Sequence, residues 1–295
     1  MKIKSTFSNT ELTRRQFLRG TALSAATFMV VRGGVLGLRG ATSPNEKLNV
    51  AGIGIGGQGA SDLGNMEREN IVALCDVDKN YAGHTFKKYP KAQQFTDYRQ
   101  MLDQMKEIEA VVVATPDHLH AFAAMEAIKR GKHVYCEKPL CHDVFEARAL
   151  AQAARHHEVT TMMGNQGHCE EGYRQLCEYI WAGAIGDVLE THSWSGFVNG
   201  GAGPRPPAKP VPAGLHWDEW LGPAPYREYH EGLHPLYWRY YRDFGTGGLG
   251  DWGCHNLDGV FWALSPGHPA SIECLGTVGG NGEKYPQAEI GRAHV

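Results

Sequence analysis

The feature that most constrains the fold is a short apolar run followed at once by a glycine-rich turn. Leu48–Ile53, LNVAGI, precedes glycines at positions 54, 56, 57 and 59. An apolar run that ends in such a turn predicts a buried strand rather than a helix fragment. Gly54-x-Gly56-x-x-Gly59 has the spacing of a dinucleotide-binding turn, with Gln58 inside it. Because Gly52-x-Gly54-x-x-Gly57 fits the same spacing, the sequence leaves the register open by two residues.

A second apolar segment ends in a carboxylate. A helix is predicted over 60–69 and a strand over 71–76, so that Asp76 closes the strand 22 positions after Gly54. A carboxylate at this place can bind both ribose hydroxyls of NAD, whereas it would repel the 2′-phosphate of NADP. The sequence therefore favours NAD as the cofactor, with NADP as the weaker candidate.

Strands and helices continue to alternate up to residue 164. Strands are expected over 109–115, 132–136 and 159–164, and helices over 116–131 and 144–157. This alternation predicts an α/β Rossmann domain over 43–164, with a doubly wound parallel sheet. Ligands gather at the carboxyl ends of such strands. Polar or turn-forming residues at these ends are Asp76, Thr115, Pro116, Glu137, Lys138, Asn165 and Gln166.

Beyond residue 164 the alternation stops, which indicates a second domain over 165–288. A helix over 173–181 and strands over 187–194 and 270–278 predict an α+β domain with a mostly antiparallel open sheet. The Pro/Gly-rich stretch Gly200–Gly232 is too long for a simple connection and predicts a loop that covers a functional site. Aromatic residues crowd positions 217–262, and flat rings beside polar groups suit sugar rings. The candidates for substrate contacts are Gln166, His168, Trp194, Tyr237 and Trp238.

Asp251 and His255 stand four residues apart, so a helix would place both on one face. A carboxylate beside an imidazole can orient the ring, set its tautomer and stabilise its cation. His255 is therefore a candidate general base, with Asp251 as its partner. Two other interpretations stay open: a zinc half-site, for which no third and fourth ligand follow at recognisable spacing, and a structural helix cap. No metal is expected.

Thr115–Leu140, TPDHLHAFAAMEAIKRGKHVYCEKPL, resembles the signature of the Gfo/Idh/MocA oxidoreductases. The glycine turn, the TP…H pattern ending at His120, GKHV and EKPL occur in the family's order, and the resemblance extends over about 48–278. It implies that Lys138 of EKP hydrogen-bonds the reacting oxygen and shares in proton transfer. It also implies that His120 and Glu137 belong to the cofactor site, and it supports the roles given to Asp251 and His255. The alternative for Lys138 is a surface lysine at a strand end.

These observations predict an NAD-dependent enzyme that takes hydride from a secondary alcohol of a sugar, glycoside or cyclitol. One alternative is a glycoside-cleaving enzyme that works by transient oxidation and elimination; related NAD-dependent glycosidases usually lack the EKP lysine, which this chain retains. A third interpretation is a non-catalytic sugar-binding module, against which the intact Lys138, Asp251 and His255 argue.

The two ends are expected to lie outside the fold. Thr13–Arg19, TRRQFLR, resembles a twin-arginine export signal, so residues 1–42 are interpreted as signal and linker of a periplasmic protein. An uncleaved signal would tether the protein to the membrane, and the alternative is a basic amphipathic N-terminus on a cytosolic protein. Residues 289–295, EIGRAHV, match the translation of a common sequencing adapter. They are expected to be an artefact that shortens the second domain and leaves its sheet with an unpaired edge.

Composition narrows the choice of partners. The 295 residues carry a formal net charge of −3 and no basic block beyond Arg14-Arg15, which argues against nucleic-acid binding. No apolar run approaches the ~20 residues of a membrane span. The seven cysteines contain no Cys-x-x-Cys pair, so buried free thiols are expected rather than a disulfide framework. By analogy with relatives that associate through the open sheet, the chain is expected to form a homo-oligomer.

Overall fold

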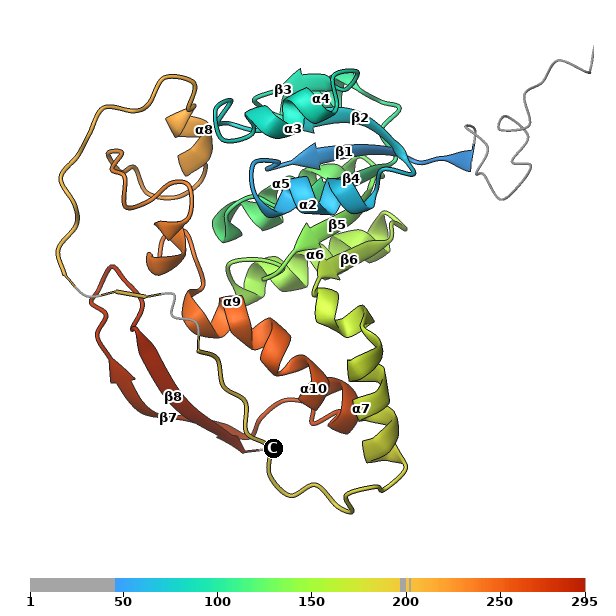
Figure 1. Cartoon of the computed structure of the whole chain (residues 1–295), viewed down its shortest axis with the longest axis vertical. Helices are drawn as coiled ribbons and strands as arrows, with labels where there is room; N and C mark the ends of the chain where they lie inside the picture. Colours follow the sequence, from blue (N-terminus) through green and yellow to red (C-terminus); the bar gives the residue numbers. More distant parts are fainter. Residues whose placement is uncertain (1–45, 197–199, 202, 295) are drawn as a thin grey trace, which may run out of the picture. The chain divides into compact units, whose positions relative to one another are not determined.

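A six-stranded parallel sheet dominates the first half of the chain in the computed structural model, which describes residues 46–196, 200–201 and 203–294 (Figure 1). Its strand order is β3-β2-β1-β4-β5-β6. The strand order reverses between β1 and β4, where doubly wound sheets bind their ligands, so the predicted Rossmann sheet is confirmed. The strands are β1 (Asn49–Ile53), β2 (Asn70–Cys75), β3 (Gln93–Phe95), β4 (Ala110–Val113), β5 (His133–Glu137) and β6 (Thr161–Gly164).

Helices form the connections between these strands. Asp143 begins α6 with a capping box, in which its side chain accepts from the backbone N–H of Glu146 at 2.8 Å. α5 buries most of its length, because small alanines let it approach the sheet closely. The helices are α2 (Gln58–Asn65), α3 (Gly83–Lys88), α4 (Tyr98–Gln104), α5 (Asp117–Lys129) and α6 (Val144–His156).

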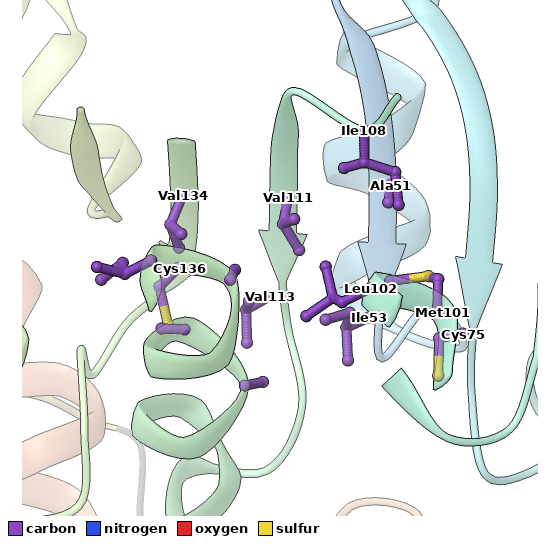
Figure 2. Close-up of a cluster of buried hydrophobic side chains, with 14 of the residues drawn as sticks. Ala51, Ile53, Cys75, Met101, Leu102, Ile108, Val111, Val113, Val134 and Cys136 are labelled. Atoms are coloured by element: carbon purple, nitrogen blue, oxygen red, sulfur yellow. The ribbon is translucent and has the colours of Figure 1, made fainter. Parts of the chain in front are cut away.

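The main core lies between the sheet and the helices α4 and α5. Residues two apart on one strand, such as Val111 and Val113 on β4, point to the same face, as the strand period requires (Figure 2). Cys75 and Cys136 belong to this core, and all seven cysteines are free thiols. The expectation of buried free thiols is therefore confirmed for Cys75, Cys136 and Cys177.

The second half is built from helices and a two-stranded antiparallel sheet, which agrees with the predicted α+β class. β8 contains residues 289–294, whose origin in a sequencing adapter remains a prediction. Short 3₁₀ turns cover Gln166–Cys169 and Tyr237–Tyr240. The other elements are α7 (Glu171–Trp181), α8 (Trp217–Leu221), α9 (Gly247–Asn256), α10 (Asp258–Leu264), β7 (Ser271–Val278) and β8 (Ala288–His294).

The strand predicted over 187–194 is wrong, because the segment forms no strand and pairs with none of those described. Leu189 and Trp194 are 94% and 81% exposed, and no strand in the described part of the chain lies beside them to complete a ladder. The sequence also failed to predict α3, β3 and α4, which are only three to seven residues long. Short elements of this kind are stabilised by packing on the sheet rather than by their own periodicity.

Residues 48–295 form one compact unit. Residues 1–45, which carry the predicted export signal, lie outside the described residues. Within the described ranges, no helix combines the length and the apolar character needed to cross a bilayer.

Candidate active site

The turn between β1 and α2 decides the register of the glycine motif. Gly54 has φ +77°, and a Cβ there would lie 2.7 Å from the carbonyl oxygen of Ala114. A Cβ at Gly59 would overlap the carbonyl oxygen of Gly54, so only glycine lets α2 pack against the turn. Gly52, by contrast, lies within β1. The motif is therefore Gly54, Gly56 and Gly59.

Tyr81 lies over the middle of this turn. A Cβ at Gly56 would overlap the Tyr81 ring, and one at Gly57 would lie 2.9 Å from its hydroxyl oxygen. The lack of side chains at both glycines therefore makes room for the Tyr81 ring over the turn. Gln58, the first residue of α2, donates from Nε2 to Oδ1 of Asp62 at 2.9 Å.

Asp76 follows β2 at the same edge of the sheet and holds the turn in place. Its Oδ2 accepts from the backbone N–H of Ile55 at 2.8 Å, and its Oδ1 accepts from that of Asp78 at 2.9 Å. Burial raises the pKa of Asp76 to about 6. A glycine turn, a helix N-terminus and a carboxylate at the next strand end are the features that hold a dinucleotide, so these residues fit NAD.

A pocket of about 240 Å³ opens beside the turn, at the carboxyl ends of β4 and β5. It brings together residues from both halves of the chain, including Lys138 and His255, two of the three predicted catalytic residues. Its lining is Gln58, Ala114, Thr115, Asp117, His120, Glu137, Lys138, Gln166, Trp238, Arg239 and His255.

Lys138 is anchored by Asp251 of α9. Its Nζ donates to Oδ1 of Asp251 and, at 3.1 Å, to the backbone carbonyl of the same residue. Both side chains are largely buried, with 17% and 9% exposure, so solvent screens the ion pair weakly. The carboxylate that the sequence assigned to His255 therefore fixes the direction of the lysine, and its partnership with His255 remains a prediction.

His255 lies on the same helix and lines the pocket. Burial lowers the pKa of His255 most strongly, and the positive charge of Lys138 lowers it further. Asp251 and Asp258 act in the opposite direction. The net lowering leaves the imidazole neutral at neutral pH, which is the state that a general base needs.

Glu137 is held beside the pocket by polar neighbours. Its Oε1 accepts from Nε2 of Gln166, and its Oε2 accepts from the backbone N–H of Lys138 at 3.2 Å. Burial and then the charge of Asp62 raise its pKa to about 7. A Cβ at Gly164 would overlap the Glu137 carboxyl group, which explains the glycine at the end of β6.

Three pocket residues, Ala114, Asp117 and Arg239, were not predicted from the sequence. Asp117, the first residue of α5, accepts from the hydroxyl and backbone N–H of Thr246 at 2.8 and 3.1 Å. Arg239 stacks on the Trp238 ring at 4.1 Å, with its Nε 4.0 Å from Oδ1 of Asp251. The position of Asp117, two residues after Thr115 at a strand end, was a usable signal. Arg239 offered none, because its contacts come from the tertiary fold.

His120 and Asn165 serve as links between elements. Nδ1 of His120 lies 2.7 Å from the carbonyl oxygen of Pro139, and its Nε2 lies 2.7 Å from that of Thr115. Burial lowers the pKa of His120 to about 4, so the neutral ring donates to one of these oxygens. Pro116 immediately precedes α5. Asn165 donates from Nδ2 to the carbonyl oxygen of Cys254 at 3.0 Å.

The predicted substrate residues divide into two groups. Gln166 and Trp238 line the pocket, whereas His168, Trp194 and Tyr237 are not among its lining. His168 lies 3.0 Å from both carboxylate oxygens of Asp258 and stacks on Trp262. Trp194 and Tyr237 are 81% and 51% exposed. Their contact with a substrate remains a prediction. Across the described ranges, no three His, Cys, Asp or Glu side chains gather as metal ligands would.

Comparison with known families assigns both halves of the chain. Residues 48–165 match the family described as "Oxidoreductase family, NAD-binding Rossmann fold" of the Gfo/Idh/MocA group. Residues 190–275 match its "Oxidoreductase family, C-terminal alpha/beta domain". The chain belongs to the Gfo/Idh/MocA oxidoreductases. Its Rossmann half is accordingly the NAD-binding half of such an oxidoreductase, as the glycine turn and Asp76 indicate.

Several relatives of this Gfo/Idh/MocA chain are named as dehydrogenases. A levoglucosan dehydrogenase of Pseudarthrobacter phenanthrenivorans is 26% identical over 72% of this chain and 52% of the relative. An inositol 2-dehydrogenase of Salmonella typhimurium is 29% identical over 50% of this chain and 44% of the relative. A third relative, a 2,7-anhydro-N-acetylneuraminate hydratase of Mediterraneibacter gnavus, is 31% identical over 48% of this chain and 37% of the relative.

A solved structure supports the fold. GenD2 from gentamicin A biosynthesis, in complex with NAD, has a TM-score of 0.56 at 20% identity, over 80% of this chain and 60% of GenD2. The chain spans about half the length of the first two of these relatives.

Proposed function

We propose that the protein is an NAD-dependent oxidoreductase that oxidises a secondary alcohol of a cyclic sugar, glycoside or polyol. The observation that carries this proposal is the pocket at the strand ends, which holds an anchored lysine and a neutral histidine beside the glycine turn. An alcohol oxidation needs both a proton acceptor and a hydride acceptor, and NAD supplies the second when it is bound.

The proposed reaction gives separate roles to the residues of the pocket. Lys138, fixed by Asp251, donates a hydrogen bond to the reacting oxygen and stabilises negative charge there as the proton leaves. Neutral His255 accepts that proton. The planar Arg239 guanidinium, which stacks on the Trp238 ring, offers a flat surface against which a sugar ring can pack. Gln166, held by Glu137, is placed to orient a substrate hydroxyl.

The relatives support the substrate class without naming the substrate. Two are named as dehydrogenases of levoglucosan and of inositol. Both names point to a cyclic polyhydroxy compound, a class that fits a pocket with several polar groups and an indole ring.

A second candidate is an elimination or hydration, including glycoside cleavage by transient oxidation. The hydratase relative favours it, because that enzyme is named for addition of water. Oxidation at one ring carbon would acidify the neighbouring C–H, and the pocket contains two carboxyl groups, Asp117 and Glu137, whose pKa values are raised to about 7 by burial. Groups that titrate near neutral pH can exchange protons with such a carbon.

Export through the twin-arginine route is also proposed, on the strength of TRRQFLR at residues 13–19. That route carries folded proteins, so the chain would bind its dinucleotide before it leaves the cytoplasm. A periplasmic protein without a supply of NAD must then retain the cofactor and reoxidise it in place. Replacing Arg14-Arg15 with two lysines should leave the protein in the cytoplasmic fraction; unchanged periplasmic recovery would contradict the proposal.

Self-association is proposed for the small sheet. Ile272, Leu275 and Val278 on β7 are 75%, 51% and 62% exposed. Several large apolar side chains exposed on one strand are normally covered in the assembled protein. Sedimentation of the product of the complete gene should report more than one chain; a monomer would contradict the proposal.

The test of function begins with the product of the complete gene. It is denatured, any released nucleotide is identified by mass spectrometry, and fresh protein is then mixed with cyclic sugars and polyols. Appearance of reduced-nicotinamide absorbance with one of them, and its loss in Lys138→Ala, would support the oxidoreductase. Release of phenol from an aryl glycoside without added NAD would support the second candidate. Sugar binding without turnover, retained in Lys138→Ala, would favour a non-catalytic module.

A further inference from the structure

Part of the segment predicted to cover a functional site lies on the Rossmann half, just beyond β2. Residues 213–216, here called the strap, contact residues 77–80. Leu215 forms an antiparallel bridge with Asp78. The backbone N–H of Lys79 donates to the carbonyl oxygen of Gly214 at 3.1 Å, and that of His216 donates to Val77 at 2.9 Å. The strap therefore forms a short antiparallel pairing with the residues that follow Asp76.

A side-chain contact closes the same junction. Asn80 donates from Nδ2 to the carbonyl oxygen of Ala213 at 2.6 Å. Gly214 has φ +90°, and a Cβ there would lie 3.0 Å from Nδ2 of Asn80. The close approach thus depends on a glycine in the strap. The side chain of Leu215 is buried with Trp217 and Trp220, so the strap is also fixed from its own side.

His234 adds a second link from the second half to the same loop. Its Nε2 donates to Oδ2 of Asp78 at 2.8 Å, and each of these side chains is only 11% exposed. Burial lowers the pKa of His234, so the ring is neutral and carries its proton on Nε2. The ring also meets the edge of Tyr81, with 5.7 Å between centroids.

These contacts connect to the predicted ribose carboxylate. Asp78 donates its backbone N–H to Oδ1 of Asp76, and Asp76 accepts from Ile55 of the glycine turn through Oδ2. Oδ1 of Asp78 accepts from the backbone N–H groups of Asn80 and Tyr81, at 2.8 and 3.1 Å. A continuous hydrogen-bonded path therefore runs from His234 through Asp78 and Asp76 to the glycine turn.

We propose that the strap and His234 complete the adenosine-ribose subsite and retain the dinucleotide, so that residues from the second half grip the cofactor end farthest from Lys138. The proposal deepens the function proposed above and rests on NAD binding at the glycine turn. Asp76 is the predicted partner of the ribose hydroxyls, and the loop that carries Asp78 and Tyr81 forms the outer wall of that subsite. Opening this wall requires breaking the strap contacts, which slows release of the nucleotide. The ligand is a dinucleotide with a free 2′-hydroxyl, because buried Asp76 and Asp78 would repel a phosphate.

The test measures release of the nucleotide rather than turnover. The full-length protein is loaded with NADH and mixed with a large excess of NAD⁺, and nicotinamide fluorescence reports the loss of bound NADH. Asn80→Asp keeps the size of an exposed side chain and replaces the donor to Ala213 by a repelling carboxylate. His234→Phe keeps the ring against Tyr81 and removes the N–H to Asp78. Lys209→Gln is the control, since Lys209 belongs to the same segment but pairs at the surface with Glu231.

Release about tenfold faster in both variants, with the control within twofold of the wild type, would support the proposal. Release at the wild-type rate in Asn80→Asp and His234→Phe would overturn it and leave the proposed function standing. If His234→Phe lowers the melting temperature, Asn80→Asp alone decides. A folded wild-type protein that binds no NADH would overturn the proposed function, and the strap proposal with it.

Discussion

Nζ of Lys138 and the carboxylate of Asp251 form a buried ion pair across the two halves of the chain. Lys138 immediately follows β5 of the Rossmann half, whereas Asp251 belongs to α9 of the second half. The pair therefore fixes Lys138, the predicted catalytic lysine, only when both halves are folded together. Because Asp251 also touches Lys138 through its backbone carbonyl, part of this placement is independent of the carboxylate.

Replacing Asp251 with asparagine should lower kcat more than it raises KM. The backbone contact keeps Lys138 near its place, but the lost charge leaves the buried ammonium uncompensated and less well directed. We expect kcat to fall by roughly 10²-fold, as for the loss of an acid–base group. Asp103→Asn is the matched control, because Asp103 pairs with Arg130 at the surface. Equal losses in the two variants would contradict the role of Asp251.

The pH dependence of His255 gives a second prediction. Burial and the charge of Lys138 lower its pKa, so the ring is neutral above a midpoint that lies below its ordinary value of 6.5. Oxidation should therefore lose rate as the pH falls through this midpoint, because the imidazolium cannot accept a proton. Lys138→Met removes one of the causes and should raise the pKa. An NMR titration of the wild type and of Lys138→Met measures the pKa of His255 in each, and His255→Gln identifies its signal. A midpoint unmoved by Lys138→Met would show that the charge of Lys138 does not lower the pKa of His255.

Two glycines of α2 offer a matched pair of variants. Gly59→Ala would press a methyl group against the carbonyl oxygen of Gly54, a backbone atom that cannot move away. We expect it to weaken NAD binding at least tenfold and to destabilise the fold by ~2 kcal/mol. A Cβ at Gly64 meets nothing closer than Nζ of Lys88 at 3.5 Å. Gly64→Ala should bind NAD normally and stabilise the helix by up to ~1 kcal/mol. Calorimetric titration and thermal unfolding distinguish the two.

The sequence predicted the nucleotide half well because its signals are local. A strand, a glycine turn, a helix and a strand-end carboxylate follow one another within 30 residues, so spacing placed Asp76 and located the glycine turn to within two residues. Lys138 was singled out by its motif at a strand end and by the family resemblance. These residues come together because carboxyl ends of parallel strands meet at one edge of the sheet.

The second half was predicted less well because its contacts are distant in sequence. The strand expected over 187–194 depended on a neighbour, and none of the described strands pairs with it. The link between His234 and Asp78 joins residues 156 positions apart, which no periodicity reveals. Arg239 was also missed, because it reaches the pocket and Asp251 through the tertiary fold and belongs to no recognisable motif.

Asp117 makes the stability of the protein depend on pH in a direction opposite to that of most carboxylates. It is buried, and burial raises its pKa from 3.8 to about 7, although the bond from Thr246 acts against this shift. The folded state therefore holds a proton that the unfolded state has released. The stabilisation of the folded state by the protonated Asp117 carboxyl is complete below pH 4 and is lost as the pH rises through about 7.

Asp117→Asn should remove this dependence. Its amide oxygen can still accept from Thr246, so the contact is kept while the titration is lost. We expect the wild type to lose stability relative to Asp117→Asn between pH 4 and pH 7, and the difference to level off above that range. Urea unfolding of both proteins at several pH values measures it, and taking the difference cancels the contributions of Asp76 and Glu137. A difference that stayed constant with pH would show that Asp117 is ionised in the folded protein throughout.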